Sequence, residues 1–273
     1  MTGVVIIWLL AWAIAGLPDG RLRVWFLNVG QGDAILMRMP AGEWVLVDGG
    51  PDTKVLDWMG RIMPFYERRL ELVINSHPHA DHLNGLVEVF TRYDVENLWI
   101  TGVKYNYAGY QKMLEEAAVR GTRVIYTSGK DGRIGKVGFD LIYPLRSLQG
   151  EGMENVNNSS IVFRLIYGGR RIFFSGDLEE QKEAELVRAE GLNLEAEILK
   201  AGHHGSKTSN TEAFVRKIAP DYAVISCGVD NKFKHPFPGT LERFGRLGAT
   251  IYRTDIDGTV VVKIDDSIKI DLF

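Results

Sequence analysis

One hexapeptide constrains this chain more than any other feature, the sequence HPHADH at residues 77–82. It follows an apolar run that is typical of a strand buried on both faces, and a helix can begin within it. Alternate residues of an extended segment project to the same side, so His77 and His79 are expected to face one point. Asp81 and His82 follow at the turn and are expected to face a neighbouring point. This spacing predicts a site for two divalent metal ions about 3.5–4 Å apart.

The other histidines accompany further polar motifs. The chain has six histidines, and those outside the hexapeptide are the pair His203-His204 and His235. Asp177 ends the run IFFSGD, where a lone aspartate would otherwise be an ordinary turn residue. Because imidazole and carboxylate groups are the usual ligands of such ions, Asp177 is expected to bridge the two metals.

The remainder of the chain contains two successive blocks of strand and helix patterns. Short β-branched and aromatic runs separated by glycines, such as RLRVWFLN, DAILMRM and EWVLVD, predict antiparallel strands. The runs SIVFRLIY and RIFFSGD are expected to form a hairpin across Gly168-Gly169. This order predicts an α/β fold, a four-layer αβ/βα sandwich of two packed sheets with helices outside. The expected helices cover residues 53–69, 82–92, 107–120, 179–190, 211–218 and 240–247.

Composition limits the possible functions. The apolar share of 45% and charged share of 25% are those of a globular protein with a full-sized core. The net charge of -3 provides no global attraction to nucleic acid, so phosphate binding needs a local patch or bound metal ions. The single cysteine, Cys227, excludes an intrachain disulfide and a cysteine-based zinc knuckle.

The N-terminus differs from the rest of the chain. Residues 3–17 form an uncharged apolar run, which is short for a membrane span of about 20 residues. It can be a signal-like segment, the stub of a membrane helix from a longer parent protein, or a buried helix. Residues 13–15 resemble a cleavage site, although no positive charge precedes the run. We therefore divide the chain into an apolar segment at 1–20 and a catalytic domain at 21–273.

Several motifs resemble those of known families. HPHADH, LVDGG at 46–50 and FFSGD resemble motifs of the metallo-β-lactamase superfamily. FLNVGQGDAIL, NNSSIVFRL, LKAGHHGSKTSN and RTDIDGTV resemble, more narrowly, the C-terminal hydrolase domain of ComEC competence proteins. The resemblance implies a nuclease that degrades the DNA strand not taken up, outside the bacterial inner membrane. DNA and the transmembrane channel part of the parent protein would be its partners, with no nucleotide cofactor.

The resemblance also implies residue roles. The last metal ligand is left open between His203-His204 and His235. The order along the chain favours His235, which leaves His203 or His204 as the acid that faces the phosphate. In the implied scheme, His77 and His79 bind the first metal, Asp81 and His82 bind the second, and Asp177 bridges both. Asp81 also forms a hydrogen bond with the attacking water. Asp48 belongs to the second layer of residues around the ligands.

One departure from the superfamily pattern bears on the metal. No histidine lies between Leu83 and Gly176, where the superfamily has a further ligand. The stretch NNSS at 157–160 occupies the corresponding place, either as a plain loop or with Asn158 and Ser160 offering oxygen atoms to metal or phosphate. Oxygen in place of nitrogen makes the site harder, which favours Mn²⁺ relative to Zn²⁺.

The expected reaction is attack of an activated water on phosphorus. Ser206, Lys207 and Thr208 are expected to hold the phosphate, and Lys200, Lys232 and Lys234 to add positive field, although surface lysines also serve solubility. Two other classes remain open. The fold also supports thioester, lactone and β-lactam hydrolysis. The second class is a domain that binds DNA or associates with a channel and whose metals are only structural. Structural metal sites usually have four protein ligands and no open position, which argues against this class.

Overall fold

The structure is a computed structural model that describes residues 18–129 and 131–273. The apolar segment expected at 1–20 therefore lies outside the described residues, apart from its last three positions. In the described part of the chain, no helix is both long enough and apolar enough to cross a membrane.

The first half of the chain and its C-terminal end build one mixed sheet. Within the described residues this sheet has eight strands in the order β15-β14-β1-β2-β3-β4-β5-β6. The pairs from β15 to β3 are antiparallel, and those from β3 to β6 are parallel. The strands are β1 (Leu22–Phe26), β2 (Ile35–Arg38), β3 (Trp44–Val47), β4 (Arg69–Ile74), β5 (Asp94–Ile100), β6 (Arg123–Tyr126), β14 (Val260–Ile264) and β15 (Ile268–Leu272).

The second half builds the other sheet, with seven strands among the described residues in the order β13-β12-β11-β10-β9-β8-β7. The predicted hairpin across Gly168-Gly169 is confirmed as the antiparallel pair β9–β10. Strands β10 to β13 run parallel. The strands are β7 (Gly132–Ile134), β8 (Val137–Tyr143), β9 (Val162–Tyr167), β10 (Arg170–Phe174), β11 (Ile198–Lys200), β12 (Tyr222–Ile225) and β13 (Thr250–Arg253).

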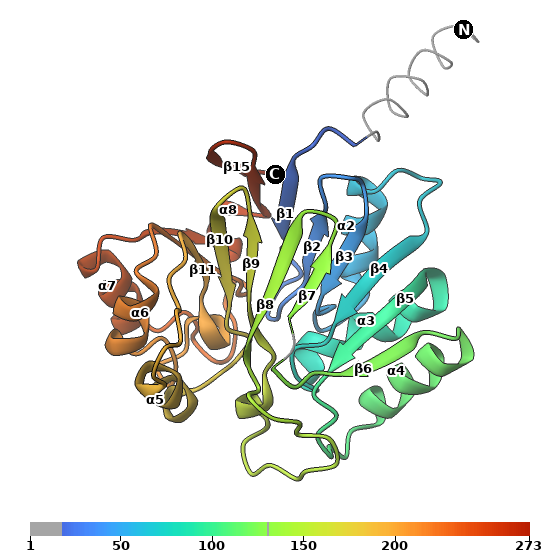
Figure 1. Cartoon of the computed structure of the whole chain (residues 1–273), viewed down its shortest axis with the longest axis horizontal. Coiled ribbons are helices and arrows are strands. Elements are labelled where there is room, and N and C mark those ends of the chain that lie inside the picture. The colour runs from blue at the N-terminus through green and yellow to red at the C-terminus, as the bar shows by residue number, and fades with distance from the viewer. Residues whose placement is uncertain (1–17, 130) are drawn as a thin grey trace, which may run out of the picture.

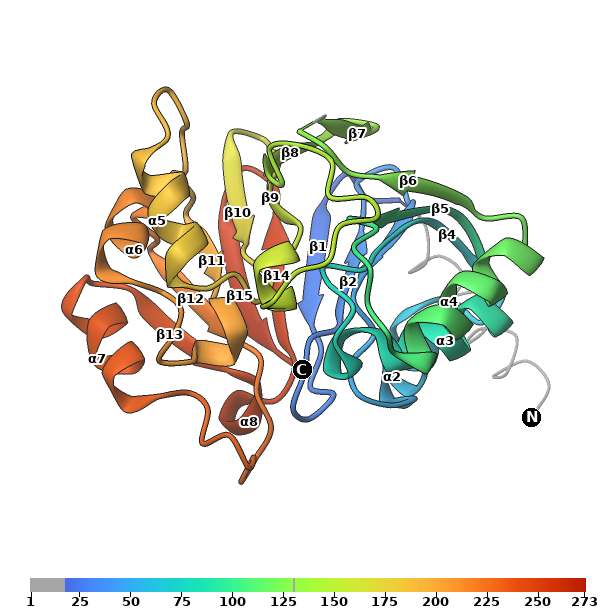
Figure 2. The same ribbon diagram turned by 90° about the horizontal axis from the view of Figure 1, so that it is seen from below.

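Helices cover the outer face of each sheet, as Figures 1 and 2 show. Separate buried clusters fill the space between the sheets and between each sheet and its helices. The predicted four-layer sandwich is thus confirmed. The helices are α2 (Lys54–Ile62), α3 (Ala80–Arg92) and α4 (Ala108–Val119) on the first sheet, α5 (Glu180–Arg188), α6 (Glu212–Ile218) and α7 (Pro238–Arg246) on the second, and the short α8 (Thr254–Asp257).

Aromatic side chains hold the two sheets together. Phe163 stacks on Phe174 with ring centroids 4.6 Å apart, and Phe174 stacks on Phe26 of the opposite sheet at 6.1 Å. All three side chains are almost fully buried. Because large buried rings remove much apolar area from water, this stack stabilises the packing of β9 and β10 against β1 of the opposite sheet.

One expectation about the elements was wrong, and four strands were not anticipated. The helix predicted over 53–69 ends at Ile62, and β4 begins at Arg69. Pro64 explains the early end, because proline cannot donate the helical hydrogen bond and disfavours helical geometry at Met63. Strands β5 to β8 were not anticipated, because charged residues and glycines interrupt their apolar alternation.

Candidate metal centre

The candidate residues meet where parallel strands end. Asp48 follows β3, and the hexapeptide follows its parallel neighbour β4. Asp177 and the pair His203-His204 follow β10 and β11, which are also parallel neighbours. Carboxyl ends of parallel strands lie at one edge of a sheet, where ligands of α/β proteins commonly bind. Both halves of the sandwich therefore contribute to one site.

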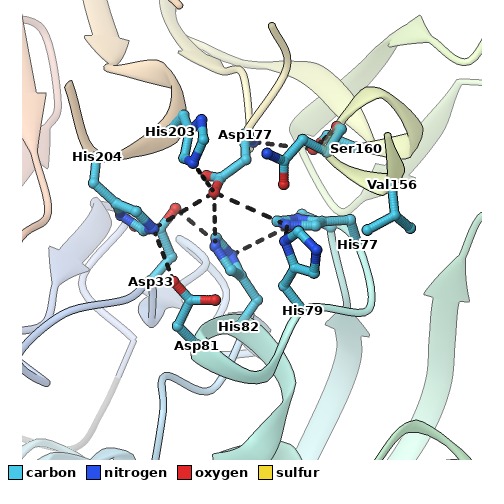
Figure 3. Close-up of polar contacts among 12 residues, drawn as sticks. Asp33, His77, His79, Asp81, His82, Val156, Ser160, Asp177, His203 and His204 are labelled. Atoms are coloured by element: carbon cyan, nitrogen blue, oxygen red, sulfur yellow. Dashed lines mark hydrogen bonds and ion pairs between the residues drawn. The ribbon is translucent and has the colours of Figure 1, made fainter. Parts of the chain in front are cut away.

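Asp177 lies at the centre of this site, with imidazoles around its carboxylate (Figure 3). Its Oδ2 atom has four histidine Nε2 atoms within 3.9 Å. These distances are 3.2 Å to His82, 3.5 Å to His204, and 3.9 Å to both His77 and His203.

The donor set fits divalent metal ions. Asp177 Oδ1, His82 Nε2 and His204 Nε2 are buried and make no hydrogen bond, although acidic oxygens lie nearby. Such atoms are costly to bury unless they bind an ion. The sets His77, His82, Asp177 and Asp81, His82, His204 each bring three ligand atoms within 4.8 Å. The clustering is thus what two adjacent metal positions require, with Asp177 between them.

His79 completes the first side of the cluster. Its Nδ1 atom lies 3.1 Å from His77 Nε2, so both nitrogens face one point, as their alternation along the chain predicts. Asp81 lies on the other side, with Oδ2 3.3 Å from His204 Nε2.

Asp48 lies behind the cluster. Its Oδ2 atom is 2.8 Å from His82 Nδ1 and accepts a 2.6 Å hydrogen bond from Ser76 Oγ, and Oδ1 accepts from the Ser76 amide at 2.7 Å. Ser76 Oγ in turn lies 3.1 Å from His77 Nδ1. A carboxylate on the far ring nitrogen fixes the tautomer of a metal ligand, so Asp48 is placed to orient two imidazoles.

The geometry favours His204 over His235 as the last ligand, whereas the order along the chain favours His235. His204 Nε2 lies 3.3 Å from Asp81 Oδ2 and 3.5 Å from Asp177 Oδ2, whereas the His235 ring centroid lies 6.2 Å from that of His204. His204 follows β11, directly beside β10 and its Asp177, and its Nδ1 atom lies 3.0 Å from the Ser226 carbonyl. His235 lies on the longer connection between β12 and α7.

His203 is less enclosed than the other central imidazoles. Its side chain is 23% exposed, and Nδ1 lies 3.2 Å from Glu179 Oε1 and 3.4 Å from Thr208 Oγ1. Its Nε2 atom faces Asp177. A partly exposed imidazole backed by a carboxylate is suited to exchange a proton with a bound substrate.

The turn that carries His203 and His204 has unusual backbone geometry. Both residues have positive φ, 48° and 52°, which non-glycine residues rarely adopt. Asn210 holds this turn, because its side-chain amide accepts from the Gly202 amide and donates to the Gly202 carbonyl. Buried Glu183 accepts from the backbone of Asn210 at 2.5 Å. The surrounding hydrogen bonds thus enforce a conformation that directs both rings into the site.

The NNSS stretch has a different arrangement from the expected one. Asn158 Oδ1 accepts from the Glu179 amide, and Ser160 Oγ donates to the Asn157 carbonyl and accepts from the Asp177 amide. These groups therefore shape the backbone that presents Asp177. The side-chain oxygen of Asn157 is buried without a hydrogen bond, which makes Asn157 the better candidate for an oxygen ligand.

The other phosphate candidates border the site. Ser206 Oγ lies 3.1 Å from Thr208 Oγ1. Lys207 between them is exposed, whereas Lys200 is fully buried and cannot reach a substrate as expected. Lys232 and Lys234 are exposed on the connection that carries His235.

Asp33 was not anticipated from the sequence. It is buried and lies 2.6 Å from Lys200 Nζ, and its Oδ1 is 3.5 Å from His204 Nδ1. The motif GQGD at 30–33 could have pointed to Asp33. It contributed to the family resemblance, but no role was assigned to its aspartate.

Charge interactions separate the imidazoles into two groups. Burial and the neighbouring His82 hold the pKa of His77 well below its usual range, and burial lowers the pKa of His79. Burial opposes protonation of His204, but Asp177 and Asp33 outweigh it and raise its pKa to about 10. A histidine binds a metal ion in its neutral form. The carboxylates around His204 favour a positive charge at that position, which a bound metal ion can supply in place of the proton.

Burial opposes ionisation of the central carboxylates, but the imidazoles overcome it. His82 and His204 hold the pKa of Asp177 well below its usual range. The neighbouring imidazoles of His204 and His82 likewise lower the pKa of Asp81. By contrast, burial followed by the charges of His204 and His203 lowers the pKa of His235 to about 4.

Comparison with known proteins agrees with this geometry. The family model described as the metallo-beta-lactamase superfamily matches residues 27–229. The chain is 28% identical over 251 residues to ComE operon protein 3 of Bacillus subtilis, covering 86% of the chain and 32% of that protein. It is 30% identical over 247 residues to competence protein ComA of Neisseria gonorrhoeae, covering 89% of the chain and 32% of that protein. The chain thus spans about a third of the length of these relatives.

A solved structure shows the same fold. The metallo-beta-lactamase fold protein YhfI from Bacillus subtilis superimposes with a TM-score of 0.58 at 11% identity, covering 90% of this chain and 100% of that one.

Proposed function

Because the chain belongs to the metallo-beta-lactamase superfamily, whose members are metal-dependent hydrolases, we propose that it is a phosphodiesterase that cleaves DNA. The observation that carries this proposal is the ring of imidazoles around Asp177, with His203 available beyond the ligand set. A spare imidazole suits a reaction in which a leaving oxygen needs a proton. The similarity to a relative named as a competence protein, together with the resemblance of the motifs to ComEC-type domains, supports DNA as the substrate.

The ligand set divides between two metal positions. Bound divalent ions would supply Lewis acidity, which makes a water molecule more acidic and neutralises charge on phosphoryl oxygens. The residues that would hold them are His77 and His79 at the first position, Asp81, His82 and His204 at the second, and Asp177 between the two.

His203 is the proposed general acid. Glu179 lies 3.2 Å from its Nδ1 atom and orients the ring, so that Nε2 faces the centre of the site. A proton on Nε2 could pass to the leaving oxygen as the phosphorus–oxygen bond breaks. Thr208 and Lys207 border the same side, where a hydroxyl and an ammonium group can bind a non-bridging phosphate oxygen.

The test is hydrolysis by purified, metal-loaded protein. Cleavage of bis-p-nitrophenyl phosphate and of labelled DNA is compared with turnover of nitrocefin and S-lactoylglutathione. Asp81→Asn should lower the phosphodiesterase rate about a thousandfold or more, because it removes a charged ligand with little change in shape. The control is Asp57→Asn, an exposed carboxylate on α2, which should retain the wild-type rate. Turnover of the thioester or β-lactam with DNA left intact would refute the nuclease assignment.

We also propose that Mn²⁺ supports turnover at least as well as Zn²⁺. The Asn157 side-chain oxygen is buried without a hydrogen bond, in the stretch of the chain where the superfamily pattern has a histidine, and oxygen favours the harder ion. Metal-free protein reconstituted with each ion tests this point. Activity with Zn²⁺ alone would mean that the choice of metal follows the imidazoles.

A final element of the proposal concerns location. We propose that the domain is attached to a membrane channel and faces the extracytoplasmic side; the apolar run at residues 3–17 and the greater length of the relatives support the attachment. Protease accessibility of this domain in intact and in permeabilised spheroplasts tests the sidedness. Digestion only after permeabilisation would refute it.

A further inference from the structure

Two connections beside the histidine cluster combine aromatic and lysine residues. The first is KYNY at residues 104–107, between β5 and α4. The second is KFKHPF at residues 232–237, between β12 and α7. We call them the first and second aromatic loops. They come from opposite halves of the sandwich, because β5 belongs to one sheet and β12 to the other.

The two loops lie on opposite sides of the cluster and are joined by an unbroken row of ring contacts. Tyr105 of the first loop contacts His79, and Phe233 of the second loop stacks on His235 with an interplanar angle of 23°. The centroid separations along the row are 5.7 Å for Phe233–His235, 6.2 Å for His235–His204, 5.2 Å for His204–His82, 4.2 Å for His82–His77, 4.8 Å for His77–His79 and 5.7 Å for His79–Tyr105.

The second loop exposes apolar rings, the tyrosines of the first loop are half-buried, and both loops expose positive charge. Phe233 is 53% exposed and Phe237 is 42% exposed, which is unusual for side chains of this size. Lys232 Nζ lies 5.0 Å from the centroid of the Phe233 ring. Lys104, Lys232 and Lys234 are all exposed, so each loop presents ammonium groups beside its rings.

An acidic hollow borders the site on another side. A cavity of about 640 Å³ is lined by Asn158 of the NNSS stretch and by several acidic residues. A polyanion would be repelled there, whereas the lysine-bearing loops attract it. The acidic lining residues are Glu151, Glu154, Glu179 and Glu180, and Lys182 adds a positive side chain to the lining.

We propose that the two aromatic loops bind unpaired nucleotides on either side of the scissile phosphate, which makes single-stranded DNA the preferred substrate. This inference rests on the proposed function. Base faces are open to a protein ring only where the strand is unpaired, because in a duplex each face is covered by its neighbour. Aromatic rings with lysines along the backbone path form the usual stacking surface for single strands. Tyr105 and Phe233 stack the flanking bases, and Lys104, Lys232 and Lys234 hold the adjoining phosphates.

The test measures binding separately from chemistry. Fluorescence polarisation gives the Kd of metal-loaded full chain for a hydrolysis-resistant phosphorothioate single strand and for the duplex of the same sequence. Wild type should bind the single strand about tenfold or more tightly than the duplex. Tyr105→Ala and Phe233→Ala should each weaken single-strand binding about fivefold to hundredfold. Tyr105→Phe and Phe233→Trp keep an aromatic ring and should bind within about twofold of wild type.

The matched control is Tyr66→Ala, because Tyr66 is also 53% exposed but is not part of either loop. It should leave single-strand binding unchanged. The proposal is overturned if both alanine variants of the loops bind like wild type, or if the duplex binds as tightly as the single strand.

Hydrolysis of bis-p-nitrophenyl phosphate is measured on the same samples. Loss of its cleavage in metal-loaded wild type would count against the proposed function, whereas the binding results decide the role of the loops. For the alanine variants, kcat/KM should fall at least about tenfold more with single-stranded DNA than with the small substrate, which has no bases to stack.

Discussion

Each central imidazole is held by an oxygen atom on one ring nitrogen, which leaves the other nitrogen directed at Asp177. Such contacts fix both the ring orientation and the tautomer before any ion arrives. The site is therefore organised by its own hydrogen bonds. The pairs are His77 with Ser76 Oγ at 3.1 Å, His82 with Asp48 Oδ2 at 2.8 Å, His203 with Glu179 Oε1 at 3.2 Å and His204 with the Ser226 carbonyl at 3.0 Å.

At this scale the assignment of His204 can be tested against His235. His204→Ala should lower the bound metal from two ions per chain toward one, because its Nε2 atom lies among the second-position ligands. His235→Ala should retain both ions, since the His235 ring lies outside His204, with their centroids 6.2 Å apart, on the connection between β12 and α7. Elemental analysis of both variants provides the measurement. Loss of an ion from His235→Ala alone would restore the assignment that chain order favours.

The buried pair of Asp33 and Lys200 allows a prediction about stability. Burial opposes ionisation of Asp33, but Lys200 and then His204 outweigh it and hold its pKa below the usual range. Lys200→Met should cost about 3–5 kcal/mol of unfolding free energy, because it leaves Asp33 without its buried counter-charge. The double variant Asp33→Asn, Lys200→Met should recover much of this loss. Urea unfolding of metal-free protein measures both, and equal destabilisation of the two would contradict the pairing.

The sequence predicts this site unevenly, for a physical reason. The placing of His77 and His79 depends on local alternation, so the spacing alone encodes it. Asp33 and His204 reach the site through the pairing of distant strands, and no local pattern records which side chain ends nearest to Asp177. The role of His204 also depends on a left-handed backbone that Asn210 enforces through its hydrogen bonds to Gly202, eight residues earlier in the sequence.

At the scale of elements, helix α3 lies very close to the β1–β2 and β3–α2 connections. A Cβ atom on Gly85 would lie 2.0 Å from the Gly49 carbonyl oxygen, and one on Gly32 would lie 2.2 Å from the Asp81 carbonyl oxygen. Backbone this close admits only glycine. Gly32, Gly49 and Gly85 thus share one task, which is to let the N-terminal part of α3, with Asp81 and His82, approach the neighbouring backbone.

Gly85→Ala should therefore displace α3. We expect a loss of about 1–3 kcal/mol in unfolding free energy from overpacking, together with reduced metal content, because Asp81 and His82 move with the helix. Gly60→Ala is the matched control, since Gly60 is exposed on α2 and a Cβ there meets nothing within 4 Å. It should stabilise the protein by about 0.5–1 kcal/mol. Thermal unfolding and metal analysis of both variants provide the measurement. If Gly85→Ala changes neither the stability nor the metal content, the backbones at Gly85 and Gly49 are not in the close contact described.

The elements themselves were predictable where a pattern was complete. The β9–β10 hairpin has apolar strands on either side of two glycines, and both glycines have positive φ, as such a turn requires. Strand β5, DVENLWI, carries two acidic residues and an asparagine in seven positions. Its place inside a parallel sheet follows from pairing with β4 and β6, which no local pattern records.

At the scale of the whole molecule, the site joins the two halves of the sandwich. The hexapeptide belongs to the first sheet, while Asp177 and His204 follow strands of the second. Ions held between them would bind the folded chain and not the unfolded one, in which these ligands are far apart. Metal binding should therefore stabilise the entire fold by mass action.

Cys227 is suited to measure this stabilisation, because it is the single cysteine and is fully buried. Burial, followed by the neighbouring Asp255, raises its pKa to about 12. The thiolate is the reactive form, so at pH 8 the folded protein should resist a thiol reagent, whereas the unfolded chain, in which the cysteine has a pKa of about 8.5, should react.

Free metal at 100 times its Kd should stabilise the fold by about 2.7 kcal/mol and slow the labelling of Cys227 about a hundredfold. A chelator should remove this protection in wild type and change little in Asp177→Asn, which lacks the bridging charge. Labelling that proceeds at the same rate with and without metal would mean that the ions bind without holding the two halves together.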